Sequence, residues 1–135
     1  MILAVVGSRD FKDESFIFNK LDQIKISHSI TGIISGGAHG VNLIAKKWAL
    51  KNGLKYIEKT PDWNTPSPGV TMRKNKFGKP YNPIAGLERN TLIVDECHCL
   101  IAFWDGQSSG TKDSIEKARK QFKILEIVYV SSKQR

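Results

Sequence analysis

Residues 31–42, TGIISGGAHGVN, decide the fold of this chain. The stretch begins as a short apolar run and ends as a glycine-rich turn. Apolar residues at helical spacing follow the turn and predict a helix: Leu43, Ile44, Trp48 and Leu50. A buried strand, a glycine turn and a helix in this order are typical of one unit of a parallel α/β sheet.

The same order recurs along the chain. Further apolar runs predict strands at 2–6, 54–58, 100–104 and 124–130. Helical spacing predicts a helix capped by Asp13, a second over 84–95 and a third from about Lys112 to Phe122. Strands that are apolar throughout and alternate with helices indicate a parallel sheet covered on both faces. We therefore expect one Rossmann-like, three-layer α/β domain over residues 1–131, with a mostly parallel sheet of about five strands and a tail at 132–135.

Residues 60–82 interrupt this pattern. They contain several prolines and glycines, four basic residues between Arg73 and Lys79, and no periodicity. We expect a long basic loop inserted into the domain, and long loops inside compact domains are usually functional or mobile. Trp63 and Phe77 in this region, and Trp104 at a strand end, are candidates either to stack on a base or to anchor the loop to the core.

Charge and composition limit the classes of partner that the protein can be expected to bind. The net charge is +8, and the whole excess lies in residues 46–135. Such a field favours anionic partners, either phosphorylated metabolites or nucleic acid, although a solvated lysine surface explains it equally. Cys97 and Cys99 flank His98 without a second cluster, so we expect reduced cysteines, no metal and no cofactor. No apolar run approaches the about 20 residues of a membrane span, and we expect a cytoplasmic protein with no membrane partner.

Three loops that follow predicted strands are rich in small residues: 7–11, 35–42 and 105–111. Parallel strands bring such loops to one edge of the sheet, where glycines let backbone N–H groups and helix N-termini approach an anion. We interpret the loops as a phosphate or ribose site, with simple turns as the alternative. None matches a Walker loop or the dinucleotide fingerprint well, which disfavours an ATPase or a dehydrogenase.

Individual residues allow two interpretations each. Arg9 is placed either to grip a phosphate or to pair with Asp10. His39 is either a ligand donor or acid–base group, or a hydrogen-bonded loop residue without chemistry. Arg89 and Asn90 either face the same cleft from a helix or belong to the surface.

Six motifs in order resemble a known family: 7–11 (GSRDF), 35–42 (SGGAHGVN), 48–49 (WA), 62–63 (DW), 85–90 (AGLERN) and 110–113 (GTKD). Over about residues 1–130 the chain resembles the YspA/YpsA-related branch of the SLOG superfamily, which also holds DprA and the LOG enzymes. The resemblance implies a Rossmann-like sheet and a site for a nucleotide or nucleotide derivative. It strengthens the case for Arg9, Arg89, Asn90 and Thr111 as ligand residues.

The loops and the resemblance together give a set of expected ligand-binding residues: Gly7, Ser8, Arg9, Ser35, Gly36, Gly37, His39, Asn42, Arg89, Asn90, Asp105, Ser109, Gly110 and Thr111. Candidate catalytic groups are Asp113, Glu88 and His39. Two departures from the family weaken an enzymatic interpretation. The branch usually has arginine and aspartate where this chain has His39 and Asn42, and the glutamate position of LOG enzymes is Ser114.

Three functions remain open. We favour a non-catalytic protein that binds an ADP-ribose-like or cyclic nucleotide signal as a sensor or sequestering protein. SLOG domains resemble sensor modules of bacterial nucleotide-signal immunity, and by analogy of fold a phage-type sponge is one form of the sequestering role. The second is a nucleotide N-glycosidase or phosphoribohydrolase-like enzyme. The third is single-stranded nucleic-acid binding in the manner of DprA. Homo-oligomers are common for this fold, but no interface is evident in the sequence.

Overall fold

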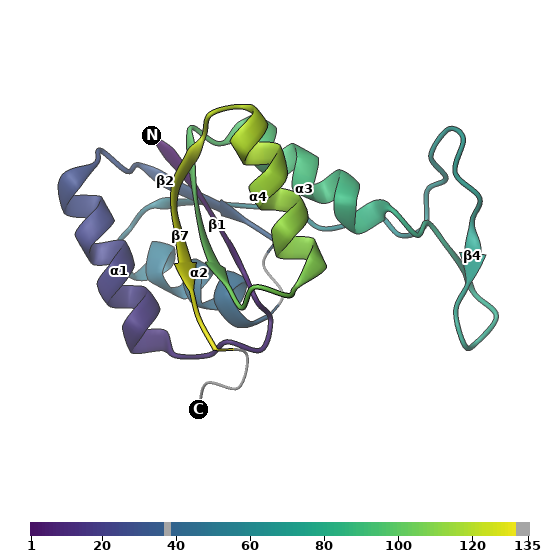
Figure 1. The fold of residues 1–135 in the computed structure, drawn as a ribbon, viewed down its shortest axis with the longest axis horizontal. Helices are drawn as coiled ribbons and strands as arrows, with labels where there is room; N and C mark the ends of the chain where they lie inside the picture. The colour runs from purple at the N-terminus through teal and green to yellow at the C-terminus, as the bar shows by residue number, and fades with distance from the viewer. Residues whose placement is uncertain (37–38, 132–135) are drawn as a thin grey trace.

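The computed structural model describes residues 1–36 and 39–131 of the chain (Figure 1). Gly37, which was expected in the ligand site, and the expected tail at 132–135 lie outside these residues. The elements in chain order are β1 (Ile2–Gly7), α1 (Glu14–Ser27), β2 (Gly32–Ser35), α2 (Gly40–Lys51), β3 (Lys55–Glu58), β4 (Arg73–Lys74), β5 (Pro80–Tyr81), α3 (Ala85–Glu96), β6 (Cys99–Trp104), α4 (Ser109–Lys120) and β7 (Ile124–Tyr129).

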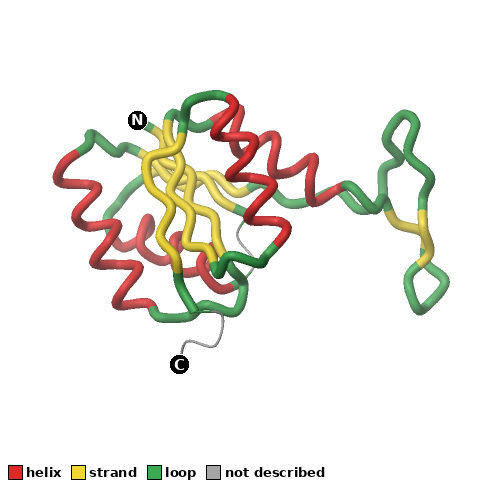
Figure 2. The backbone as a smooth tube through the Cα atoms, viewed as in Figure 1, coloured by secondary structure: helices red, strands yellow, loops and turns green. Residues whose placement is uncertain are grey.

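The central sheet has five strands in the order β3-β2-β1-β6-β7, and every neighbouring pair is parallel. Alternate residues of β1 face opposite layers. Leu3 and Val5 pack in one core with residues of α1 and α2, whereas Ala4 and Val6 pack in a second core with residues of α3 and α4. The predicted three-layer α/β fold with a parallel sheet is thereby confirmed (Figures 1 and 2).

The strand order determines where a ligand can bind. The chain runs outward from β1 through β2 to β3, and then returns to the other side of β1 as β6 and β7. Loops that follow β1 and β6 therefore diverge, and open α/β sheets bind ligands in the crevice at such a reversal. The glycine-rich loops are at this carboxyl edge.

The start of α4 differs from the prediction. The helix begins at Ser109 and not near Lys112, so Ser109, Gly110 and Thr111 form its first turn. Asp105 explains the early start, because its carboxylate accepts hydrogen bonds from the backbone N–H groups of Gln107 and Ser108 and closes the turn before the helix. The helix also ends at Lys120, before the predicted Phe122.

Residues 60–82 form an arm that projects from the body beside the start of α3 (Figures 1 and 2). The predicted loop contains a short antiparallel ribbon, in which Arg73 of β4 faces Tyr81 of β5. Asn82, only 1% exposed, fastens the arm to the body. Its side-chain amide donates to the carbonyl of Thr65, to the hydroxyl of Ser67 and to the carboxylate of Glu88.

Two absences concern the described part of the chain. None of its helices has the length and apolar character needed to cross a membrane. Residues 1–36 and 39–131 also contain no cluster of three or more His, Cys, Asp or Glu side chains placed to hold a metal ion.

Candidate functional site

A cleft of ≈ 400 Å³ lies at the carboxyl edge of the sheet, between the ends of β1 and β2 and the helices α3 and α4. Among the described residues, eleven of those expected from the sequence line it: Gly7, Ser8, Arg9, Gly36, His39, Asn42, Arg89, Asn90, Ser109, Gly110 and Thr111. The cleft also has lining residues that sequence reasoning did not select: Val6, Ile93, Ser108 and Ser114. Helical spacing would have found two of them, because Ile93 and Ser114 lie four residues after Arg89 and Gly110.

Two glycines bring the first loop against the start of α2. A Cβ atom on Gly7 would stand 2.6 Å from the carbonyl oxygen of Phe103 and 2.7 Å from a methyl group of Val41. Gly40 has a left-handed φ of +52°, and a Cβ there would overlap the backbone of Arg9. Glycine is therefore required at both positions for the N-terminus of α2 to reach the loop that carries Arg9.

Arg89 and Arg9 supply uncompensated positive charge to this cleft. The Arg89 guanidinium donates from Nε to the side-chain oxygen of Asn90 at 3.0 Å and from Nη1 to the carbonyl of Lys59 at 3.5 Å. Burial lowers the pKa of Arg89, and the nearby charge of Arg9 lowers it further. No ion pair with a described carboxylate involves either arginine. Two close cations without a carboxylate are the electrostatic arrangement of an anion site.

Gly36 makes room for the Arg89 guanidinium. A Cβ on Gly36 would stand 2.5 Å from Nη1 and 3.1 Å from Cζ of Arg89. The end of β2 and the side chain from α3 thus meet in direct contact, and a larger residue would push the guanidinium out of place.

Two helices point uncapped N-termini at the same edge. α1 is capped by the carboxylate of Asp13, whereas the N-cap residues of α2 and α4, His39 and Ser108, make no side-chain capping bond, and neither helix has an acidic residue in its first turn. First-turn N–H groups without a capping partner bind anions readily. Gly110 adds open space, because no described atom outside its chain neighbours and its own helix backbone lies within 4 Å of where its Cβ would be.

Asn42 supplies a polar atom without a partner. Its side-chain oxygen is buried and accepts no hydrogen bond among the described residues. A buried acceptor of this kind is costly unless a donor reaches it. A ligand hydroxyl or N–H group in the cleft would satisfy it.

Two further expected ligand residues, Ser35 and Asp105, do not line the cleft. The Ser35 hydroxyl is fully buried at 2.6 Å from the hydroxyl of Tyr56. The Asp105 carboxylate is occupied by the 105–108 turn, whose hydrogen bonds, that from Ser108 N–H above all, lower the pKa of this carboxyl. Both therefore act in the structure around the cleft, and Gly37 is not described.

Of the three candidate catalytic residues, one lines the cleft and two lie outside it. His39 lines the cleft. Asp113 pairs with Lys117 at 2.7 Å and accepts from Asn90 at 3.2 Å, while Glu88 accepts from Ser67 at the root of the arm. Neither Asp113 nor Glu88 belongs to the lining, and no described lining residue is a carboxylate.

The three candidate stacking residues lie outside the cleft. Trp63 and Phe77 belong to the arm, and both are exposed. Trp104 donates from its indole N–H to the carbonyl of Ser108 at 3.1 Å and packs against the ring of Tyr129. Trp104 therefore supports the turn before α4.

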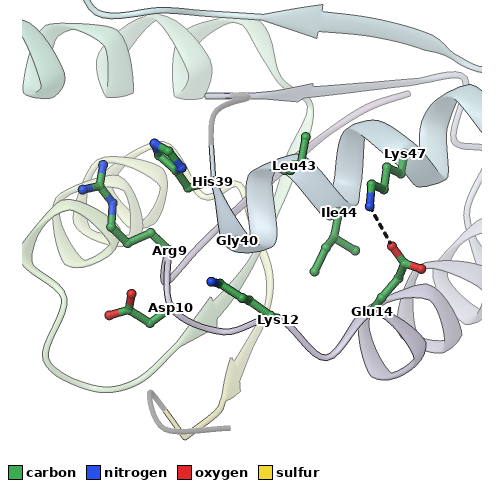
Figure 3. A pocket seen from close by; sticks show the side chains of 9 residues that line it. All are labelled: Arg9, Asp10, Lys12, Glu14, His39, Gly40, Leu43, Ile44 and Lys47. Carbon is green, nitrogen blue, oxygen red and sulfur yellow. Dashed lines mark hydrogen bonds and ion pairs between the residues drawn. The ribbon is translucent and has the colours of Figure 1, made fainter. Parts of the chain in front are cut away.

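A second hollow of ≈ 460 Å³ adjoins the cleft and shares Arg9 and His39 with it. Figure 3 shows these two side chains at one end of the hollow and the ion pair of Lys47 with Glu14, at 3.5 Å, at the other. Leu43 and Ile44 of α2 supply an apolar wall. The two hollows together offer a polar compartment and a partly apolar one on either side of Arg9.

The parallel sheet, its strand order and the glycine turns at one edge define a Rossmann-like α/β domain. Residues 1–65 match the family described as YspA, cpYpsA-related SLOG, and this match covers just under half of the chain. No curated protein matches the sequence.

Solved structures of DNA processing protein A (DprA) share the fold. The protein from Streptococcus pneumoniae superposes with a TM-score of 0.67 at 23% identity, over 95% of this chain and 50% of that one. The protein from Helicobacter pylori, whose structure concerns its single-stranded DNA-binding mode, gives 0.65 at 22% identity, over 93% of this chain and 64% of that one. This chain therefore spans only half to about two thirds of these proteins, and the likeness concerns the fold.

Proposed function

We propose that this protein binds a nucleotide-derived, anionic small molecule in the cleft at the carboxyl edge and does not turn it over. The observation that carries the proposal is the pair Arg9 and Arg89, which have no described carboxylate partner and face the uncapped N-termini of α2 and α4. Phosphate groups suit this arrangement, because guanidinium forks and helix N-termini both donate to phosphate oxygens.

The shape of the site favours a ligand with two parts. Its cleft of ≈ 400 Å³ lies within the range of roughly 300–1,000 Å³ typical of small-molecule sites. The adjoining hollow shares Arg9, so a phosphate held there would leave one part of the ligand in each compartment. An ADP-ribose-like molecule or a cyclic nucleotide signal has this form, and a ribose hydroxyl would satisfy the buried oxygen of Asn42.

Binding without turnover agrees with the lining of the cleft. Cleavage of an N-glycosidic or phosphate bond needs an acid or base aimed at the reacting centre. The described lining of the ≈ 400 Å³ cleft has no carboxylate; Asp10 and Glu14 line the adjoining hollow, where Glu14 pairs with Lys47. Ser114, which stands at the LOG glutamate position, donates its hydroxyl to the carbonyl of Gly110. His39 is the remaining lining residue whose side chain ordinarily titrates near neutral pH. We therefore favour a sensor or sequestering role over an N-glycosidase or phosphoribohydrolase-like enzyme.

Binding assays on the full chain test this proposal. Native mass spectrometry would first identify any molecule retained after purification. Calorimetric titration with AMP, ADP-ribose, NAD and cyclic AMP should then give saturable binding of at least one compound. Arg9→Gln and Arg89→Met should weaken it, whereas Arg119→Gln, on the exposed face of α4, should not.

The outcomes separate the alternatives. Chromatography after incubation should return the ligand unaltered, and release of free base would instead establish an enzyme. The proposal fails if no compound of the panel binds and no molecule is retained, or if the Arg119 variant loses as much affinity as the other two.

A further inference from the structure

The arm formed by residues 60–82 carries a second concentration of positive charge, separate from the cleft. Arg73, Lys74, Lys76 and Lys79 are all exposed. From residue 63 to residue 82 the sequence contains no aspartate or glutamate. Because no acidic side chain of the arm beyond Asp62 offsets these cations, the arm has the charge of a surface that meets a polyanion.

A slot of ≈ 470 Å³ lies in the arm between its root and its ribbon. Its walls are the rings of Trp63, Tyr81 and Pro80, with Lys79 at the edge. The Trp63 and Tyr81 rings contact edge to face at 6.4 Å, which holds them in fixed orientation. An aromatic slot beside a cation suits a flat ring that is joined to a phosphate.

Unused amide groups border the same slot. Asn64 and Asn75 line it, and the Asn64 side chain makes no hydrogen bond with any described residue. The Asn75 side-chain oxygen accepts from the N–H groups of Phe77 and Lys79, whereas its NH₂ group has no acceptor in the described chain. Amide donors and acceptors at the rim of an aromatic slot are the groups that read the edge of an unpaired base.

Phe77 stands at the tip of the arm in a turn that holds it in solvent. Its side chain is 82% exposed. The two hydrogen bonds to the oxygen of Asn75 and the left-handed Gly78, with φ of +78°, fix this turn. The ammonium group of Lys76 lies 5.1 Å from the ring centre. An ordered, exposed aromatic ring next to a cation is a platform for a stacked base.

We propose that the arm binds single-stranded nucleic acid, with one base in the slot of Trp63 and Tyr81, another stacked on Phe77, and the phosphates along Arg73–Lys79. The strand must be single because both bases have to leave a duplex to reach these surfaces. This proposal rests on the arm alone and stands or falls independently of the cleft.

The test is fluorescence anisotropy of labelled oligonucleotides with the full chain. Phe77→Ala should lower affinity for a single-stranded oligothymidine by at least about fivefold, the lower end of measured stacking effects. Phe122→Ala is the matched control, since Phe122 is 96% exposed on the body of the protein. It should leave affinity unchanged.

Salt dependence gives a second measurement that does not depend on stacking. For a single strand, the slope of log K against log salt changes by about 0.7 for each phosphate that the protein neutralises. Arg73→Gln with Lys76→Gln should therefore make the slope shallower by about 1.4, whereas Lys55→Gln with Lys120→Gln, at exposed body positions, should affect it little. Circular dichroism would verify that each variant is folded.

Four results would overturn the proposal: no binding of the oligonucleotide at low salt, equal effects of the Phe77 and Phe122 variants, equal binding of a duplex of the same length, or equal salt slopes for the two double variants. A dimer that the arm variants dissociate, together with absent oligonucleotide binding, would assign the arm to a second copy of the chain.

Discussion

Replacing Gly36 by alanine tests the cleft with a single methyl group. The Cβ would stand 2.5 Å from Nη1 of Arg89, a distance that real Cβ atoms do not adopt. The obstacle is the end of a flexible side chain, so the guanidinium will move and the backbone will stay. The variant therefore displaces Arg89 without removing it.

The expected loss follows from the bond that the displaced guanidinium can no longer make. A hydrogen bond between charged groups contributes about 1.5–3 kcal/mol, which corresponds to roughly 10- to 150-fold in the dissociation constant. The free energy of unfolding should not fall by more than about 0.5 kcal/mol, because the side chain leaves a place where burial and Arg9 both oppose its charge.

Calorimetric titration with the nucleotide that binds the natural protein, and urea denaturation without ligand, measure the two quantities. Gly86→Ala is the matched control, since a Cβ there meets only the Trp63 ring at 3.6 Å. It should leave affinity unchanged. Gly7→Ala should instead destabilise the protein, because the obstacle at 2.6 Å is the backbone carbonyl of Phe103. If Gly36→Ala binds as tightly as the natural protein, Arg89 does not contact the ligand and our account of the cleft is wrong.

Three further predictions concern single residues. Arg9→Gln should reduce nucleotide affinity about tenfold or more at unchanged urea midpoint, and a matching loss in Arg119→Gln would show that only net charge matters. Asp105→Ala should lower the free energy of unfolding by about 1 kcal/mol at pH 7, because the carboxylate holds the turn before α4. The pKa of this carboxyl in the folded protein lies below 3.8, so the difference in stability between the natural protein and the variant should shrink as pH falls below that value. An equal difference in stability at pH 3 and pH 7 would contradict the prediction. Burial raises the pKa of the Cys97 thiol from 9.0 to about 11, so the stability that the thiol contributes is present below pH 9 and is lost as pH rises towards 11. In urea denaturation, Cys97→Ala should therefore lose less stability between pH 9 and pH 11 than the natural protein does. Identical dependence of stability on pH in the two proteins would refute this prediction.

The central sheet was predictable because each strand is a continuous apolar run followed by a turn signal. The run Ile2–Val6 gives β1, which has neighbours on both sides and is buried by helices on both faces. The edge strand β3 is less buried, and its prediction depended on its place in the alternation. Serine, glycine and threonine favour turns, so the sequence predicts a loop where the first turn of α4 lies. The part of Asp105 in closing the turn before α4 depends on the direction of its side chain.

The cleft was predictable in outline and not in detail. Parallel topology dictates that glycine turns after β1, β2 and β6 share one edge. Side-chain direction decides the rest: Ser35 turns inward to Tyr56, and Glu88 turns towards the arm while its neighbour Arg89 turns towards the cleft. The ribbon within residues 60–82 was not predictable, because only two pairs of residues form it and this is too short for a periodic pattern. The turn between its two strands is held by hydrogen bonds to the side-chain oxygen of Asn75, which leave no periodic signal either.

Asn82 has a consequence for how the arm can vary in length. The buried amide of Asn82, on the returning segment of the arm, binds the outgoing segment at Thr65 and Ser67 and also Glu88 in the first turn of α3. Shortening or grafting between residues 68 and 79 leaves this fastening whole, so related chains and engineered versions can carry different tips on a common base. A cut that removes Asn82 would strip Glu88 of a donor and loosen the start of the helix that presents Arg89 to the cleft.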